Sequence, residues 1–430
     1  MNISFYTLGC KMNQFETQAL GIMLTEHGHL ICNDFSEADV IVINTCTVTS
    51  VSDQKSRKAI RHLKNEHPNA KIVVCGCLSQ VNPESIRAID GVDIIAGTSD
   101  REKLVDMIDR LALENPDSFT LDNPLKRREF EYLPSGGLDG RTRAMLKIED
   151  GCVNFCTYCI IPYSRGPVRS MPFETVLSEA LKLRKEGYRE IVITGIEISS
   201  YGTDLRPRSS LSEITAALCD SLPDVRFRLG SIEPRSITEE FCVKLKNFTN
   251  LCPHFHLSMQ SGCDETLLRM NRKYDTARFF ESVSLLREHF KNCAVTTDMI
   301  VGFPGETDEE FRKTLKFIEK CDFSSMHIFP YSRRPGTPAS SMPNQLTRAE
   351  KAQRAKLAEE TASSMKNEFL SRQIGKELSV LFEQRDGDYF RGHAENYVNV
   401  YLKTSENMHN KLANVLIDGL FLDGVTGSKF

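Results

Sequence analysis

The feature that most constrains the fold is an alternation of short apolar runs with longer amphipathic stretches. In the first 125 residues, the runs "ISFYTLGC", "VIVINTC" and "KIVVCGC" are separated by helical patterns at about residues 15–28 and 51–66. Parallel strands need a long crossover connection, usually a helix, so this order predicts a parallel sheet. We therefore expect a small N-terminal α/β domain at residues 1–125.

A second series of strands follows a segment, residues 126–140, whose Pro, Gly and charged residues show no periodicity and indicate a linker. Helical patterns such as "FETVLSEALKLRKEG" separate most of these strands. Six such units predict an open or partial (βα) barrel at residues 141–370, with ligands at the carboxyl ends of its strands. The six runs are "RAMLKIE", "EIVITG", "VRFRLGS", "HFHLSM", "AVTTDMIVG" and "MHIFP".

The C-terminal part of the chain has a different texture. A polar helix is predicted from Thr347 to about Arg372. After Gly375 come short strands separated by Gly and Asp turns, such as "ELSVLFEQ" and "YVNVYLK". This pattern predicts a small all-β barrel or sandwich at residues 371–430.

Composition limits the classes that remain. A net charge of −4 gives no nucleic-acid signature for the whole chain, so any basic surface must be local. The N-terminus lacks the features of a signal peptide, and no run approaches the ~18 apolar residues of a membrane span. We expect a cytoplasmic protein without membrane contact. In that compartment, 14 cysteines indicate metal binding, redox chemistry or buried thiols rather than disulfides.

Three of these cysteines, Cys152, Cys156 and Cys159, form a CxxxCxxC motif after the strand "AMLKIE". A cubane iron–sulfur cluster normally has four thiolate ligands, so three leave one iron open to another molecule. The alternatives are a zinc site completed by a distant His and a group of buried thiols. Structural zinc sites usually supply close-spaced ligand pairs, and no second pair lies nearby. The motif therefore favours a cluster with an open iron.

CxxxCxxC after the first strand of a partial barrel resembles the radical S-adenosylmethionine (SAM) enzymes. The aromatic Tyr158 just before the last cysteine also fits their pattern. The resemblance implies that a [4Fe–4S] cluster binds the amino and carboxylate groups of SAM at its open iron. Reductive cleavage of SAM would then give a 5′-deoxyadenosyl radical, with the protein orienting the cofactor and excluding water.

Three more cysteines, Cys10, Cys46 and Cys77, each follow an apolar strand of the first domain. Because carboxyl ends of parallel strands share one edge of a sheet, these thiols should converge there. Gly9 and Gly76 precede two of them and allow close approach of the backbone. Coincidence stays an alternative, and Cys75 competes for the third position, although its place inside the strand suits burial.

The surrounding motifs "TLGCKMNQFET", "INTCTVT" and "CGCLSQ" resemble the N-terminal domain of the methylthiotransferases, a family of radical SAM enzymes. The resemblance implies a second, auxiliary [4Fe–4S] cluster on Cys10, Cys46 and Cys77. Ser79 departs from the Ala expected there. The likeness continues through "TGIEISSYG", "LGSIEP", "HLSMQSGCDETLLRMNRKY" and "DMIVGFPGET", and so covers essentially the whole chain.

The family reaction replaces an unactivated C–H bond by C–S–CH3, and the resemblance implies two SAM molecules. One donates a methyl group to sulfur on the auxiliary cluster, and the other is the source of the radical that activates the substrate carbon. The reaction also implies an electron donor such as flavodoxin or ferredoxin. We expect the protein to act as a monomer.

Contacts to SAM are expected at the ends of the barrel strands. By resemblance, they involve Gly195 and Glu197, which end the second strand, and Asp298 of the fifth. Ser258 and Gln260 end the fourth strand and are expected to point toward the same mouth. Glu197 has an alternative interpretation as an ordinary acid at a helix N-terminus. In the fourth strand, His254 and His256 are interpreted as strand residues with local partners rather than as metal ligands.

The family branches differ in substrate. One modifies N6-threonylcarbamoyladenosine at position 37 of tRNA, one modifies isopentenyladenosine at the same position, and one acts on an aspartate of a ribosomal protein. "LGCKMNQFET" and "ITGIEISSYG" look most like the first branch, which implies C2 of adenosine 37 as the target and the tRNA anticodon stem-loop as partner. A distant alternative is a non-catalytic iron–sulfur protein that binds RNA or senses redox state.

RNA binding requires local positive charge. Arg57, Arg61 and Lys64 share one face of a predicted helix, and Arg333 and Arg334 are further candidates. A solvated helix face is the alternative for the first three. The C-terminal segment resembles a TRAM domain, yet residues 367–430 hold seven Lys and Arg against nine Asp and Glu. RNA binding there would depend on a small patch with Tyr389, Phe390 and Tyr397, which could equally be core residues.

Overall fold

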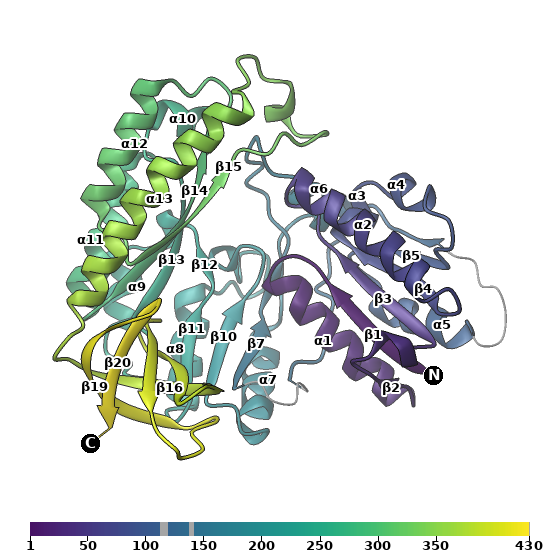
Figure 1. Cartoon of the computed structure of the whole chain (residues 1–430), viewed down its shortest axis with the longest axis horizontal. Coiled ribbons are helices and arrows are strands. Elements are labelled where there is room, and N and C mark those ends of the chain that lie inside the picture. The colour runs from purple at the N-terminus through teal and green to yellow at the C-terminus, as the bar shows by residue number, and fades with distance from the viewer. Residues whose placement is uncertain (112–118, 137–141, 430) are drawn as a thin grey trace. The chain divides into compact units, whose positions relative to one another are not determined.

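The computed structural model describes residues 1–111, 119–136 and 142–429 (Figure 1). The chain divides into two compact units. Unit 1 comprises residues 1–138, 149–171 and 332–340, and unit 2 comprises residues 139–148, 172–331 and 341–430. The end of the predicted linker and the start of the predicted core at residue 141 lie outside the described residues. Residues 149–171 place the CxxxCxxC loop in the same unit as the N-terminal sheet. The domain boundaries expected from the sequence stay a prediction.

Unit 1 is built on a parallel sheet with strand order β2-β1-β3-β4-β5-β6. Its central strand β3 is buried at all six positions, as expected for a strand covered on both faces. Helices α1 and α5 pack on one face, and α2, α3 and α4 pack on the other. The three predicted strands are confirmed, but α1 begins at Lys11, earlier than predicted, because Cys10 is already its N-cap.

The elements of unit 1 have the following bounds. The strands are β1 (Asn2–Thr7), β2 (Leu30–Ile31), β3 (Val40–Thr45), β4 (Lys71–Gly76), β5 (Ile94–Ala96), β6 (Phe119–Thr120), β8 (Glu149–Asp150) and β9 (Arg169–Ser170). The helices are α1 (Lys11–Glu26), α2 (Ser50–Glu66), α3 (Cys77–Val81), α4 (Glu84–Arg87), α5 (Arg101–Arg110) and α6 (Ile161–Arg165).

The core of unit 2 is the predicted partial barrel. Two parallel sheets form it, with orders β11-β10-β7 and β12-β13-β14-β15. All six predicted strands are present, and a short strand that was not predicted, β12, follows β11 directly after Gly230. Because β11 pairs with β10 while β12 pairs with β13, the chain passes from the first sheet to the second at this glycine.

The core elements have these bounds. The strands are β7 (Arg143–Lys147), β10 (Glu190–Thr194), β11 (Arg226–Leu229), β12 (Ser231–Ile232), β13 (His254–Gln260), β14 (Ala294–Val301) and β15 (Ser325–Pro330). The helices are α7 (Phe173–Lys185), α8 (Leu211–Ser221), α9 (Glu239–Leu245), α10 (Asp264–Arg269), α11 (Thr276–His289), α12 (Asp308–Cys321) and α13 (Arg348–Ser371).

The C-terminal strands close into a five-stranded barrel, drawn in yellow in Figure 1, with order β16-β17-β18-β20-β19. Apolar side chains from all five strands fill it, which confirms the predicted all-β module. Its strands are β16 (Glu377–Asp386), β17 (Tyr389–Ala394), β18 (Asn399–Lys403), β19 (Leu412–Phe421) and β20 (Gly424–Lys429).

Two arginines of β11 join the barrel to the core within unit 2. Arg226 donates to the carbonyl oxygen of Ser379 at 2.8 Å, and Arg228 donates to that of Glu395 at 2.9 Å. Both guanidiniums also pair with the fully buried carboxylate of Glu190. Burial alone would raise the pKa of Glu190, but the two arginines hold it well below its usual range.

The predicted polar helix is α13, which begins with a capping box formed by Thr347 and Glu350. It packs along β15. Although it is the longest of the described helices, it is too polar to cross a membrane, and no other described helix is long and apolar enough to do so.

Candidate functional site

The three N-terminal cysteines lie at the carboxyl ends of neighbouring strands. Cys10 follows β1 and is the N-cap of α1, Cys46 directly follows β3, and Cys77 is the first residue of α3 after β4. All 14 cysteines of the chain lie within the described residues, and none of them forms a disulfide. The topology thus brings these three thiols to one edge of the sheet, as their positions in the sequence predicted.

The backbone around this edge is tightly packed. Gly9 has a φ of +106°, and a Cβ built on it would lie 2.7 Å from the Cβ of Cys46. Gly76 has a φ of +98°, and its Cβ would lie 2.6 Å from the carbonyl oxygen of Thr45. Only glycine fits both positions, which explains why a glycine directly precedes the cysteine at each of these two strand ends.

A buried asparagine fixes the first cysteine loop to the second strand end. The side-chain amide of Asn13 donates to the carbonyl oxygens of Leu8 and Thr45 at 2.8 and 2.9 Å. Burial raises the pKa of the Cys46 thiol to about 11, and the neighbouring Cys77 and Cys10 add to the rise. The three thiols are therefore electrostatic neighbours that would become thiolates on binding metal.

The CxxxCxxC loop belongs to the same unit and is held by its own backbone. The N–H of Cys152 donates to the carbonyl oxygen of Gly166 at 2.9 Å, and the N–H of Cys159 donates to the carbonyl oxygen of Cys156 at 2.9 Å. The N–H of Asn154 points to the sulfur of Cys152 at 3.5 Å. An N–H directed at sulfur stabilises a thiolate, so the Asn154 contact suits Cys152 as a cluster ligand, and the three-cysteine set stays a prediction. Tyr158 is half-buried in this loop.

Arg165 links the two cysteine groups of unit 1. It lies at the end of α6, six residues after Cys159, and is fully buried. Its Nη2 lies 3.5 Å from the sulfur of Cys77 and 3.2 Å from Oε2 of Glu16. Its Nη1 lies 3.5 Å from Asp150, two residues before Cys152. One guanidinium thus contacts a candidate ligand of one cluster and the segment that leads into the other.

A second buried arginine, Arg101, contacts the same carboxylate as Arg165. Arg101 donates to Glu16 at 3.0 Å, so this carboxylate lies between two guanidiniums. Although burial alone would lower it, Glu16, Cys77 and Asp150 hold the pKa of Arg165 well above its ordinary value. Sequence reasoning missed this network. Its only local signal was a charged residue in the otherwise apolar run "CIIPYSRG".

The residues of the barrel strands that are predicted to contact SAM belong to unit 2. Tyr158, in the CxxxCxxC loop, belongs to unit 1. Gly195 follows β10 directly, and Glu197 is the N-cap of a short 3-10 helix, Ile198–Ser200. The Glu197 carboxylate accepts hydrogen bonds from the Ser199 N–H and the Ser200 hydroxyl, and burial raises its pKa. This capping geometry favours the alternative interpretation of Glu197, while SAM contact stays a prediction.

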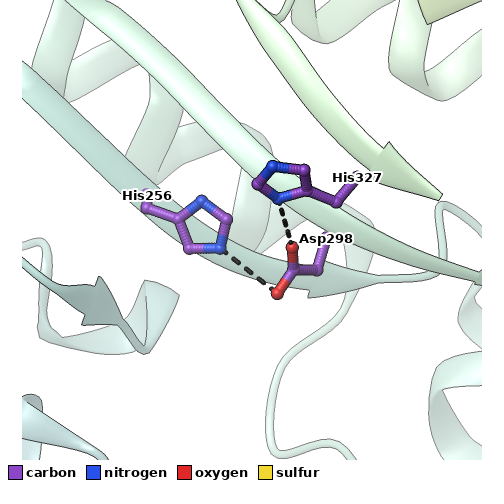
Figure 2. Close-up of side chains that lie close together, drawn as sticks. All are labelled: His256, Asp298 and His327. Carbon is purple, nitrogen blue, oxygen red and sulfur yellow. Dashed lines mark hydrogen bonds and ion pairs between the residues drawn. The ribbon is translucent and has the colours of Figure 1, made fainter. Parts of the chain in front are cut away.

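Ser258 and Gln260 lie in the last part of β13, and Asp298 lies in the adjacent strand β14. The carbonyl oxygen of Ser258 accepts from Arg272 at 3.1 Å, and Gln260 has a φ of +67°. Asp298 lies between His256 and His327 (Figure 2). Burial alone would raise the pKa of Asp298, but these two imidazoles hold it well below its usual range.

The predicted RNA-binding cations differ in their surroundings. In α2, Arg61 is exposed and Arg57 is half-buried, while the Lys64 ammonium donates to the carbonyl oxygens of Pro68 and Ala70. Arg333 is exposed, whereas Arg334 is buried, pairs with Asp53 at 3.0 Å and also bonds Thr47. Arg61 and Arg333 are therefore the best placed of the five to meet a large polyanion.

The aromatic residues singled out in the barrel are mostly used in packing. Phe390 is in the barrel core, and Tyr397 stacks between His254 and His393 with ring centroids 4.5 and 4.7 Å away. Tyr389 is half-buried, and its ring centroid lies 4.7 Å from that of Phe421. Tyr397 thus belongs to the joint between barrel and core, and the alternative of structural aromatics is favoured for two of the three.

Family models and solved structures match the two parts of the fold. Residues 146–318 match the radical SAM superfamily, and residues 2–97 match the uncharacterized protein family UPF0004. The structure of the radical S-adenosylmethionine methyltransferase TsrM from Kitasatospora setae aligns with a TM-score of 0.58 at 15% identity. That alignment covers 90% of this chain and 79% of TsrM. The fold and the CxxxCxxC loop thus define a radical SAM enzyme, which implies a [4Fe–4S] cluster and SAM.

Curated relatives define the family more narrowly. The chain is 41% identical over 424 residues to the threonylcarbamoyladenosine tRNA methylthiotransferase MtaB of Bacillus subtilis, covering 96% of this chain and 93% of the relative. It is 38% identical to the MtaB of Thermotoga maritima, over 88% of this chain and 85% of the relative. A tRNA-2-methylthio-N(6)-dimethylallyladenosine synthase of Clostridium tetani is 36% identical, over 79% and 76%. The chain belongs to the radical SAM methylthiotransferases.

Proposed function

We propose that this enzyme converts N6-threonylcarbamoyladenosine at position 37 of tRNA to its 2-methylthio derivative. The names of the relatives from Bacillus subtilis and Thermotoga maritima support this substrate. The similarity to these relatives carries the substrate. The placement of both cysteine groups in one compact unit, with Arg165 in contact with Cys77 and Asp150, supports methylthio transfer. A reaction that needs both a radical and a sulfur source requires two such centres.

We assign one cluster to each group of thiols. Cys152, Cys156 and Cys159 would hold the [4Fe–4S] cluster that, with SAM, supplies a radical able to take hydrogen from an unactivated carbon. Cys10, Cys46 and Cys77 would hold an auxiliary cluster that supplies the sulfur. The donor sets fit, because each offers three thiols and leaves one position for another ligand.

The chain's own residues would position these groups. Gly9 and Gly76 let the backbone come close to the auxiliary thiols. The Asn154 N–H donates a hydrogen bond to the sulfur of Cys152. Arg165 would place a buried positive charge next to Cys77, which offsets part of the negative charge of an iron–sulfur centre. Exposed cations such as Arg61 and Arg333 would meet the phosphates of the anticodon stem-loop.

The proposal is tested with the purified enzyme, its clusters assembled without oxygen, and a reductant such as flavodoxin or ferredoxin. One tRNA substrate carries N6-threonylcarbamoyladenosine at position 37, and the other carries isopentenyladenosine there. Mass spectrometry of the nucleosides should show a methylthio product from the first tRNA alone. Product from the second alone would assign the chain to the isopentenyladenosine branch. A monomeric state and a cytoplasmic location stay predictions.

A further inference from the structure

Three side chains of unit 2 converge on one point, although they come from three different strands. They are His256 of β13, Asp298 of β14 and His327 of β15, and all three point toward one another in Figure 2. The sheet register explains this. His256 pairs with Thr296, Asp298 lies two residues further along the same face, and Asp298 itself pairs with His327.

The distances within this group are those of ligands around a metal ion. The Nε2 of His256 lies 3.3 Å from one carboxylate oxygen of Asp298, and the Nδ1 of His327 lies 3.0 Å from the other. All three ligand atoms lie within 4.8 Å of one another. Ligands bound at about 2.0–2.2 Å to one tetrahedral or octahedral ion stand about 3.0–3.5 Å apart. The carboxylate and each imidazole thus already have this separation.

The surroundings also suit a metal ligand set. The Nδ1 of His256 lies 3.0 Å from the Thr296 hydroxyl, the kind of outer hydrogen bond that orients a ligating imidazole. When Thr296 accepts from this nitrogen, the Nε2 lone pair of His256 faces Asp298. The side chain of His327 is 66% exposed and that of His256 is 15% exposed, so the group opens toward solvent on one side. That opening provides an entry path and room for water ligands.

We propose that His256, Asp298 and His327 bind a first-row divalent metal ion. Two imidazoles and one carboxylate favour Zn²⁺ or Fe²⁺, with water in the remaining positions. This site contains no thiol, and its three residues belong to unit 2, whereas both cysteine groups belong to unit 1. We assign Asp298 to a metal ion in place of the SAM contact expected from the sequence.

From the sequence, His256 is interpreted as a strand residue with a local partner rather than as a metal ligand. Its place in β13 and its contact with Thr296 agree with the first part. We depart from the second part, because the register brings in Asp298 and His327. The competing account is a group held only by ring N–H groups that donate to Asp298.

The test measures zinc in the holoenzyme, whose cysteine sites are already filled with iron. Wild type and His327→Gln are dialysed against buffered Zn²⁺ without oxygen, and zinc and iron per chain are measured by mass spectrometry. His327 is largely exposed, so its replacement should not disturb folding. His289→Gln is the matched control, because within the part of the chain that the structure describes His289 pairs with a single carboxylate, that of Glu239, at 2.9 Å. We expect His327→Gln to lose one zinc per chain and His289→Gln to lose none, with iron unchanged.

Zinc X-ray absorption of the wild-type holoenzyme identifies the donors. We expect only nitrogen and oxygen atoms bound to the zinc, and we expect His256→Gln to lose the same equivalent of zinc. Equal zinc in wild type and His327→Gln would overturn the proposal, as would sulfur in the zinc shell. Either result would leave the three side chains as a hydrogen-bonded group.

Discussion

The Nη2 of Arg165 lies 3.5 Å from the sulfur of Cys77, and both residues are buried. The same guanidinium contacts Glu16 and Asp150, so a residue of the CxxxCxxC segment completes the surroundings of the other cysteine group. Positive charge and N–H···S contacts stabilise the reduced form of an iron–sulfur cluster and raise its reduction potential. This relationship makes Arg165 a positioning residue whose effect can be separated from its contribution to folding.

Replacing Arg165 by Gln should lower the reduction potential of the auxiliary cluster. It should also lower the free energy of unfolding by about 3 kcal/mol, because Glu16 loses a buried partner. The potential is measured by EPR-monitored titration in a background with Cys152, Cys156 and Cys159 changed to Ala. Arg101→Gln is the control, since Arg101 shares Glu16. It should cost similar stability and leave the potential nearly unchanged. Equal shifts in both variants would argue against a direct effect on Cys77.

The two cysteine groups should fail in different ways. Cys156→Ala should abolish production of 5′-deoxyadenosine, because the site for SAM cleavage is lost. Cys46→Ala should keep SAM cleavage but stop methylthio transfer, because the sulfur source is lost. Both products are quantified by mass spectrometry, together with iron per chain. Normal methylthio transfer by Cys46→Ala would contradict the assignment of the auxiliary group.

Cys77 and Cys75 are distinguished by the same measurements. Cys75 lies inside β4, fully buried in the hydrophobic core, whereas Cys77 opens α3 at the edge that Cys10 and Cys46 share. Cys75→Ala should therefore retain the iron of both clusters, and Cys77→Ala should lose that of the auxiliary cluster. Loss of iron in Cys75→Ala with retention in Cys77→Ala would reverse the ligand assignment.

Gly9 should be far less tolerant of substitution than another glycine with positive φ. A Cβ at Gly9 would lie 2.9 Å from the sulfur of Cys46, while one at Gly28 would have no atom within 4 Å. Gly28→Ala therefore carries only the cost of a left-handed backbone, about 1–2 kcal/mol. Gly9→Ala should in addition lose auxiliary-cluster iron. The two variants are compared by iron content and thermal unfolding, and full iron in Gly9→Ala would show that the contact with Cys46 does not constrain the site.

The stabilisation that Glu190 gives to the joint of barrel and core should depend on pH. Its pKa is lowered in the folded state, so its contribution is fully present above the unfolded glutamate pKa of about 4.3. It is lost as pH falls through the lowered folded pKa. At pH 7, Glu190→Gln should lower the free energy of unfolding by about 3–5 kcal/mol, because Arg226 and Arg228 lose their buried partner.

Urea unfolding at several pH values checks this expectation. The difference between wild type and Glu190→Gln should shrink progressively below pH 4. The exposed Glu360, which lies 4.0 Å from Lys356, provides the control, and Glu360→Gln should change stability by less than about 0.5 kcal/mol. A difference at pH 7 no larger than that of this control would contradict the role of Glu190.

The sequence predicted the parts that depend on local patterns. The β-branched run "VIVINT" favours a strand of a parallel sheet, and it forms β3, which is buried at all six positions. Cysteines that end successive parallel strands meet at one edge because topology alone requires it. Arg165 and Glu16 are 149 residues apart, and nothing near either residue specifies the other. The same holds for Asp298 and His327, whose meeting depends on the register of β14 and β15.

The sequence was least able to predict which of the candidate RNA-binding cations are exposed to solvent. The helix that carries Arg57, Arg61 and Lys64 is present as α2, but helical periodicity could not foresee that Lys64 would bond two carbonyl oxygens just beyond the helix. Arg334 likewise follows an exposed arginine in the sequence yet is buried against Asp53. Charge alone does not distinguish a cation that stays in solvent from one that satisfies a neighbouring loop.

The central claim is tested most directly by mass spectrometry of tRNA nucleosides from cells with and without this gene. Cells that lack the gene receive wild type, Cys156→Ala or Cys46→Ala on a plasmid. The account predicts loss of 2-methylthio-N6-threonylcarbamoyladenosine, accumulation of its precursor, and restoration by wild type alone. An unchanged nucleoside profile in cells without the gene would contradict it and would point to the ribosomal-protein branch.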